Sequence, residues 1–275
     1  MSELTAPVPD LGGGESRWSE GRARRRRRLT IWAARLLLVL VFIAIWGITS
    51  GRIVDDFYIS SPGDVADQLW EWTTDGTLTS NLSVTLQELI LGFLMGAVGG
   101  MVLGVAVGLG RFASEVIEPF VQAAYSVPKI ALMPLFIVWF GIGMLPKVLL
   151  AAVSVFFIVF FTTFAGVREV DANFVNVLRV MGAKRTAIVR KVVLPSTLTW
   201  IFAGLTISVP QAFTGAVAGE ILVSNEGIGY LVQTSATNFN TAGVFAGLTV
   251  IVVVAAILGG LLKVAEARAM RWKAA

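Results

Sequence analysis

The sequence contains no cysteine and no histidine. These absences exclude disulfides, thiol nucleophiles, Cys/His zinc sites and imidazole acid-base catalysis. Charge is also scarce, since 15% of the residues are charged and 56% are hydrophobic, which is far more apolar than an ordinary soluble domain. A nucleotide-binding G-x-x-x-x-G-K-[ST] loop is missing as well. This composition predicts a polytopic membrane protein without a metal site of its own.

Apolar runs of about 20 residues, each long enough to cross a bilayer, predict an all-α fold with about six transmembrane helices. The runs fall near Ile31–Ser50, Thr85–Leu109, Pro119–Phe140, Leu145–Gly166, Leu198–Leu222 and Gly243–Lys263. With the amino terminus in the cytoplasm, 19 of the 22 Lys and Arg residues lie on the inner side. We therefore expect a multi-pass protein of the cell (inner or plasma) membrane with both termini cytoplasmic.

The first 30 residues are rich in Gly and Pro and then basic. They predict a disordered cytoplasmic tail, 1–30, whose arginine cluster anchors to lipid headgroups rather than to nucleic acid. The first apolar run is expected to be an uncleaved anchor instead of a signal peptide, because it is long enough to span a bilayer. Residues 31–275 are expected to form the transmembrane domain.

Carboxylates are predicted only in tails, loops or near helix ends, with Glu88 near the start of the second span and Glu220 at the end of the fifth. The same topology leaves Lys147 on the outer side of the membrane. Ion-coupled carriers usually need a carboxylate inside the membrane. Because the chain also lacks a phosphate-binding loop, energy for uphill transport would have to come from another subunit.

The largest predicted cytoplasmic loop is 167–195. Four apolar residues at helical spacing predict a short helix there: Phe174, Val177, Leu178 and Met181. Gly182 breaks this pattern, and residues 183–193 predict a second helix that Pro195 would end or kink. The unit either rests an apolar face on lipid or docks a soluble cytoplasmic partner.

The stretch from Gly182 through nine residues to Val192 and Leu194–Pro195 resembles the cytoplasmic loop motif of permease subunits in binding-protein-dependent ABC importers. That motif opens with Glu-Ala-Ala, which would align with Asn176-Val177-Leu178, so the chain departs from the motif there; Ala183 follows the glycine. The segments "GTLTSNLSVTLQELILGF" and "PKIALMPLFIVWFGIG" are similar to the nitrate, sulfonate, taurine and thiamine-precursor branch of that family. The resemblance runs from about Ile59 to Ala267.

This resemblance implies a type I ABC importer permease fold and a homodimer of the chain. It also implies two cytoplasmic ATPase subunits, which bind the ATP and Mg, and an extracytoplasmic solute-binding protein. The helix before Gly182 would be the coupling helix that sits in a groove of the ATPase. The chain itself would be a transport subunit and not an enzyme.

Two further patterns carry predictions. Five glycines recur every fourth residue in the second span and predict close approach of a neighbouring helix: Gly92, Gly96, Gly100, Gly104 and Gly108. Candidate residues of the translocation pathway are Ser126, Lys129, Ser208, Gln211 and Thr214. Lys129 is expected near the middle of the third span between Pro128 and Pro134, where it either attracts an anionic substrate or extends to an interface.

The resulting hypothesis is the permease subunit of an ATP-driven importer for a small anionic or polar organic solute of the sulfonate, taurine, nitrate, aromatic carboxylate or thiamine-precursor class. Two alternatives remain open: an ion-coupled carrier or channel, and a membrane scaffold that recruits a cytoplasmic partner through loop 167–195. The acidic first outer loop, with a helix predicted to start at Ser61–Pro62, is either a solvated face or a docking surface for the binding protein.

Overall fold

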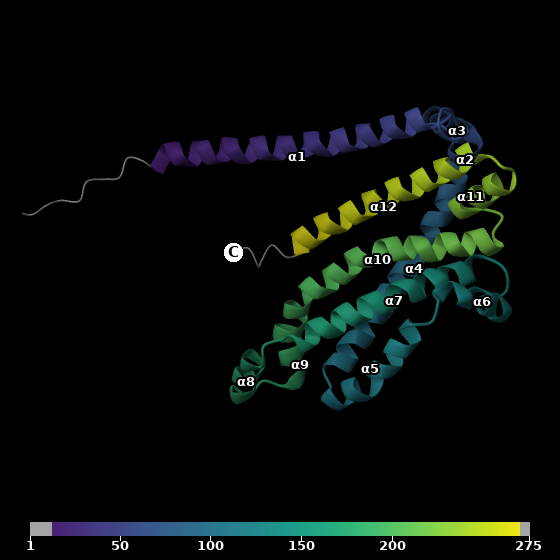
Figure 1. Cartoon of the computed structure of the whole chain (residues 1–275). Coiled ribbons are helices and arrows are strands. Elements are labelled where there is room, and N and C mark those ends of the chain that lie inside the picture. The colour runs from purple at the N-terminus through teal and green to yellow at the C-terminus, as the bar shows by residue number, and fades with distance from the viewer. Residues whose placement is uncertain (1–12, 270–275) are drawn as a thin grey trace, which may run out of the picture. The chain divides into compact units, whose positions relative to one another are not determined.

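A computed structural model describes residues 13–269, and in this part of the chain the ordered elements are helices (Figure 1). In chain order they are α1 (Gly13–Thr49), α2 (Asp56–Ile59), α3 (Pro62–Thr74), α4 (Thr77–Gly108), α5 (Arg111–Tyr125), η1 (Lys129–Leu132), α6 (Met133–Phe140), α7 (Met144–Arg168), α8 (Ala172–Val180), α9 (Arg185–Ile188), η2 (Val189–Val193), α10 (Leu194–Val223), α11 (Ile228–Thr237) and α12 (Thr241–Ala269).

The chain divides into two compact units, 1–62 and 63–275. In the first unit, α1 begins at Gly13, whereas the sequence predicts a disordered tail up to residue 30. Residues 1–12 lie outside the described residues, so disorder there stays a prediction. The end of α1 is tied to the turn after α2, because the Trp46 indole and the Ser50 hydroxyl both donate to the Ser60 carbonyl, at 3.1 and 2.7 Å.

The expected all-α membrane fold is confirmed, with one correction to the third span. Five helices are long and apolar enough to cross a membrane: Leu29–Thr49, Thr77–Gly108, Met144–Arg168, Arg185–Val223 and Thr241–Ala269. The predicted span Pro119–Phe140 is not one straight helix, since α5 and the η1–α6 segment meet at 87°. Pro128 explains the break, because a proline disfavours a helical conformation of the residue before it and removes a backbone donor.

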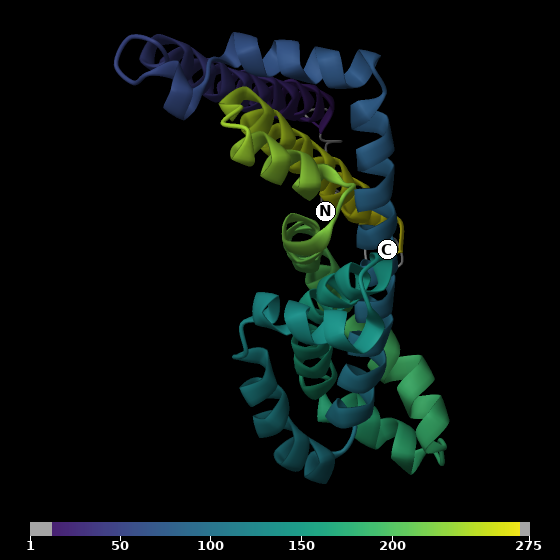
Figure 2. The same cartoon turned by 90° about the vertical axis from the view of Figure 1, so that its right-hand side faces the viewer.

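Helix α7 forms the centre of the second unit and is its most buried span. It lies between α4 and α10, and the core they share is apolar (Figure 1). The buried members are Leu89, Ala97, Val155, Val159, Val209, Ala212 and Phe213. Residues of α12 pack against this core, and Figure 2 shows α4 as a long helix beside α7. Apolar burial of this kind holds α4, α7, α10 and α12 together.

The glycine ridge of α4 lies directly against α7. A Cβ added at Gly92 would lie 2.8 Å from the Val148 carbonyl oxygen, and one at Gly100 would lie 2.7 Å from that of Phe156. A Cβ at Gly96 or Gly104 would likewise meet a backbone oxygen of α7, whereas one at Gly108 would meet the Val167 side chain at 2.9 Å. The two backbones approach too closely at the ridge for any side chain larger than hydrogen.

Different short helices lie at the two ends of the second unit (Figure 1). Helices α8 and α9 lie at one end of the α4–α7–α10 bundle, and α6 and α11 lie at the other (Figure 1). Helix α3 belongs to the α11 end, because the Asn240 amide donates to the Gln68 carbonyl oxygen at 2.8 Å. Helix α3 starts at Pro62 and buries Val65 and Trp72, so the predicted helix with an apolar face is present.

Candidate functional site

The loop between α7 and α10 folds as a helix, a tight turn and a second helix. The Asp171 carboxylate caps α8 by accepting from the Asn173 N–H at 2.8 Å. Two backbone hydrogen bonds close the turn. The Gly182 N–H donates to the Arg179 carbonyl and the Ala183 N–H donates to the Leu178 carbonyl, both at 2.9 Å. Gly182 has φ +78°, a conformation in which a Cβ is strained. The glycine therefore sets the angle between the two helices.

The apolar residues of α8 divide into an outward and an inward set. Phe174, Val177 and Met181 are 65%, 58% and 75% exposed. Leu178, which was predicted on the same face, instead packs against the buried Val167, Ile188 and Val193. Val180 is 90% exposed and joins the outward set, although the sequence pattern did not single it out. We call Phe174, Val177, Val180 and Met181 the outward face of α8.

The second arm of the loop runs into the fifth span without interruption. Residues Arg185–Val223 form one helix of 39 residues, so of the two predicted effects of Pro195, an end or a kink of the loop helix, the end is wrong. The five residues Val189–Val193 widen into a π turn before Leu194 and Pro195. Such a turn relieves the clash between a proline ring and the carbonyl four residues earlier. The loop is thereby a continuous extension of a membrane helix.

Lys129 lies at the 87° bend between α5 and α6, in η1. Its ammonium group lies over the Tyr125 ring, 4.1 Å from the centroid, and 5.9 Å from that of Phe157. The side chain is half-buried, and no ion pair to it is present among residues 13–269. The charge is thus held against aromatic faces, which bind cations, and retains the capacity to attract an anion.

The other candidate pathway residues do not share one face. Ser126 is exposed beside the bend and donates to the Gln122 carbonyl at 3.1 Å. On α10, Gln211 and Thr214 are exposed, but Ser208 is fully buried and donates to its own helix at the Leu205 carbonyl. Residues three apart on an α-helix differ in direction by about 60° around the helix axis. Ser208 and Thr214, which are two such intervals apart, therefore point to different sides. Of the three candidates on α10, Gln211 and Thr214 are exposed and Ser208 is not.

A buried charge cluster lies at the opposite end of the bundle and was not predicted. Lys147 of α7 forms an ion pair with Glu88 of α4, and its ammonium group donates to the Ser224 hydroxyl at 3.0 Å. Glu220 of α10 interacts with Glu88. Relative exposures of Glu88, Glu220 and Lys147 are 0%, 1% and 6%, so Lys147, which was counted among the charges on the outer side, is buried within the bundle. The expectation that both carboxylates lie at helix ends also fails for Glu88, which is inside α4.

This cluster also holds the beginning of α11. The Thr85 hydroxyl donates to the Glu220 carboxylate at 2.6 Å and accepts from the Ile228 N–H at 2.8 Å. Glu220 accepts from the Gly229 N–H at 2.7 Å, and the Asn81 amide oxygen accepts from the Gly227 N–H at 2.8 Å. Side chains of α4 and α10 therefore satisfy the free N–H groups at a helix start, where a carboxylate is also favoured by the helix dipole.

The sequence matches the family described as binding-protein-dependent transport system inner membrane component over residues 96–271, which is more than half of the chain. The chain belongs to this family. Two curated relatives illustrate it. One from Bacillus subtilis (strain 168), named as an aliphatic sulfonates transport permease protein SsuC, is 32% identical over 99% of this chain and 97% of its own length. The taurine transport system permease protein TauC of Escherichia coli (strain K12) is 27% identical, over 90% of each chain.

Solved structures of ABC importers have the same fold as this permease. A chain of an amino acid ABC transporter superposes with a TM-score of 0.60, covering 74% of this chain and 98% of that one at 16% identity. A chain of the MetNI methionine ABC transporter, in an inward-facing conformation, superposes with a TM-score of 0.52, covering 73% and 95% at 23% identity. The protein is thus an ABC importer permease, a multi-pass membrane protein whose family members are transport subunits and not enzymes.

Proposed function

We propose that this permease is the transmembrane subunit of an ATP-driven importer and that α8 is its coupling helix for a separate cytoplasmic ATPase. The observation that carries the proposal is the outward face of α8, which exposes four apolar side chains at the end of the bundle. A rigid helix–turn–helix that continues into a membrane span can transmit movement of a partner to that span. The lysine and arginine distribution supports a cytoplasmic position for this loop and for both termini.

The proposed cargo is a small anionic organic solute of the sulfonate and taurine class. Relatives named for sulfonate and taurine transport cover 99% and 90% of this chain. Transport would require a second copy of the permease and two ATPases, which bind ATP and Mg. An extracytoplasmic binding protein would deliver the solute to the α11 end, where α3 exposes Asp64, Asp67 and Glu71 and the turn after it exposes Asp75.

Replacing Phe174 with aspartate is expected to reduce copurification of the ATPase by about tenfold or more, because a charge would enter the centre of an apolar contact. The measurement is the amount of ATPase retained on the affinity-tagged permease in detergent. Trp70→Asp is the matched control, since Trp70 is an exposed aromatic residue on α3 at the opposite end. Equal loss in both variants, or uptake that survives ATP depletion, would count against the proposed function.

Lys129→Met is expected to lower the uptake of an anionic solute several-fold, because the one cation at the bend would be replaced by an isosteric apolar group. Lys129→Arg should retain uptake, since a guanidinium also binds over the Tyr125 and Phe157 rings. Uptake of radiolabelled sulfonate into proteoliposomes with the ATPase and binding protein measures both. Unchanged uptake by an intact Lys129→Met complex would remove Lys129 from the pathway.

A further inference from the structure

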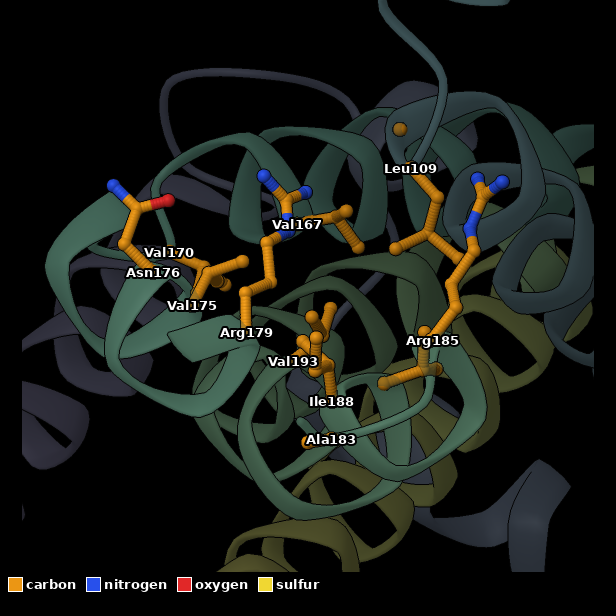
Figure 3. A pocket seen from close by; sticks show the side chains of 12 residues that line it. Leu109, Val167, Val170, Val175, Asn176, Arg179, Ala183, Arg185, Ile188 and Val193 are labelled. Carbon is orange, nitrogen blue, oxygen red and sulfur yellow. The ribbon is translucent and has the colours of Figure 1, made fainter. Parts of the chain in front are cut away.

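A pocket of about 500 Å³ lies on the inner side of α8, where the ends of α4 and α7 meet the start of the α9–α10 helix (Figure 3). Most of its wall is apolar. The apolar side chains are Leu109, Val167, Val170, Val175, Ala183, Ile188, Val189 and Val193. Only three polar side chains line the pocket: Asn176 and Arg179 of α8 and Arg185 of α9. No Asp or Glu is among the lining residues. The occupant that fits this lining is an amphiphile with an anionic head.

The two arginines provide the anion-binding groups. Figure 3 shows the side chains of Arg179 and Arg185 extending in the same direction from their two helices. Neither guanidinium forms an ion pair with a carboxylate in the part of the chain that the structure describes. Arginine stays charged at every physiological pH and binds phosphate with paired hydrogen bonds. The neutral Asn176 stands where the loop motif has a glutamate, so the lining leaves both charges uncompensated.

The pocket is separate from the face of α8 that is proposed to bind the ATPase. Val175, Asn176 and Arg179 line the pocket. Phe174 and Val177 are on the outward face, and the helical repeat of about 100° per residue places the centres of the two sets on roughly opposite sides of α8. An ATPase bound to the outward face therefore leaves the pocket to another ligand.

We propose that this pocket binds the headgroup phosphate of an anionic phospholipid, with the adjoining part of the lipid against the apolar wall. The site lies at the ends of membrane-spanning helices, beside Gly108 of α4 and Val167 of α7, where the headgroups of the surrounding lipid would be in reach. Basic pockets between such helix ends suit anionic lipids of the cytoplasmic leaflet. A free phosphate or an acidic side chain would leave the apolar wall uncovered. The assignment to this leaflet rests on the proposed function.

The lipid would act as a spacer that fixes the distance of α8 from the membrane helices. Arg179 is on the first arm of the loop and Arg185 is on the second, on either side of the Gly182 turn. One phosphate bound by both arginines would restrict the angle between the two arms. Anionic lipid is therefore expected to strengthen the mechanical connection between the ATPase and α10.

The test measures phosphatidylglycerol bound to the purified full-length permease by native mass spectrometry, with phosphatidylcholine and inorganic phosphate as comparison ligands. The double variant Arg179→Gln/Arg185→Gln should bind phosphatidylglycerol about thirtyfold more weakly. The matched control Arg190→Gln/Lys191→Gln removes two exposed charges of the same loop that do not line the pocket, and should keep the affinity. Asn176→Glu, which adds a carboxylate to the lining, should also weaken binding.

Three results would overturn the proposal. They are unchanged binding in the double variant, an equal loss in the control, and displacement of the lipid by inorganic phosphate at equal affinity, which would indicate a free anion as the ligand. The lipid measurement needs no ATPase, whereas the Phe174→Asp experiment measures only how much ATPase copurifies with the permease. Failure of the lipid site and failure of the proposed function are therefore distinguishable.

Discussion

Lys147→Met is expected to destabilise the permease by about 3–5 kcal/mol, the cost of removing one partner of a buried ion pair. Glu88 and Glu220 would remain together at 0% and 1% exposure without the ammonium group that compensates their charge. Because Glu220 also holds the Gly229 N–H, the start of α11 should loosen with the loss of Lys147. Thermal unfolding in lipid nanodiscs, followed by tryptophan fluorescence, measures the change.

Two further variants identify the cause of that loss. In Lys147→Met/Glu88→Gln, one uncompensated carboxylate is removed, so this double variant should be more stable than Lys147→Met alone. Arg111→Met is the surface control, because the Arg111–Glu115 pair has side chains that are 91% and 64% exposed. Exposed pairs of this kind contribute about 0–1 kcal/mol. A Lys147→Met permease as stable as the Arg111→Met control would contradict the buried cluster.

Gly100→Ala is expected to cost about 1–3 kcal/mol, because a new methyl group would be forced into a packed interface. The added Cβ would lie 2.7 Å from the Phe156 carbonyl oxygen and 2.9 Å from the Phe160 nitrogen, both backbone atoms of α7. Backbone atoms inside a helix cannot move away as a flexible side chain can. The same nanodisc unfolding measurement should show a lower midpoint temperature. Transport activity, measured as uptake into proteoliposomes, should also be lower.

Gly99→Ala is the matched control, since it lies one residue away on the same helix. A Cβ there would meet only the ring of Phe156, at 3.4 Å, which is ordinary van der Waals contact. The control should be neutral or slightly stabilising, because alanine has the higher helix propensity. If Gly99→Ala and Gly100→Ala were equally harmful, helix α4 would not pack on α7 through the four-residue ridge.

Hydropathy predicted the membrane helices well because the cost of exposing polar backbone to lipid favours long apolar helices. It could not predict the bend in the third span. The run Pro119–Phe140 is mostly apolar, and Pro128, Pro134 and Lys129 were the signals that the helix is broken there. The four-residue glycine spacing was a stronger signal, since it specifies one face of one helix.

The charge cluster was missed because its members are far apart in the sequence and pair only through tertiary packing. Glu88 lay inside a predicted apolar span, and a carboxylate in such a position requires a partner. Lys147 was counted on the outer side because it lies at the start of the predicted fourth span, shortly after the "GIGM" connection. Likewise, helical spacing placed Leu178 with Phe174, whereas the packing of α8 on Val167 and Ile188 turned Leu178 inward. Periodicity identifies a helix but does not determine which neighbour covers each of its sides.

The central claim is that the outward face of α8 contacts an ATPase in the cytoplasm. The chain has no native cysteine, so Val180→Cys, at a position that is 90% exposed, introduces a unique thiol. Disulfide crosslinking in inverted membrane vesicles against an ATPase that carries single cysteines in its permease-facing groove tests the contact directly. The account predicts a crosslink with Val180→Cys that responds to ATP, and none with Trp70→Cys at the opposite end. A crosslink only with Trp70→Cys, or labelling of Val180→Cys from outside intact cells by a membrane-impermeant thiol reagent, would contradict it.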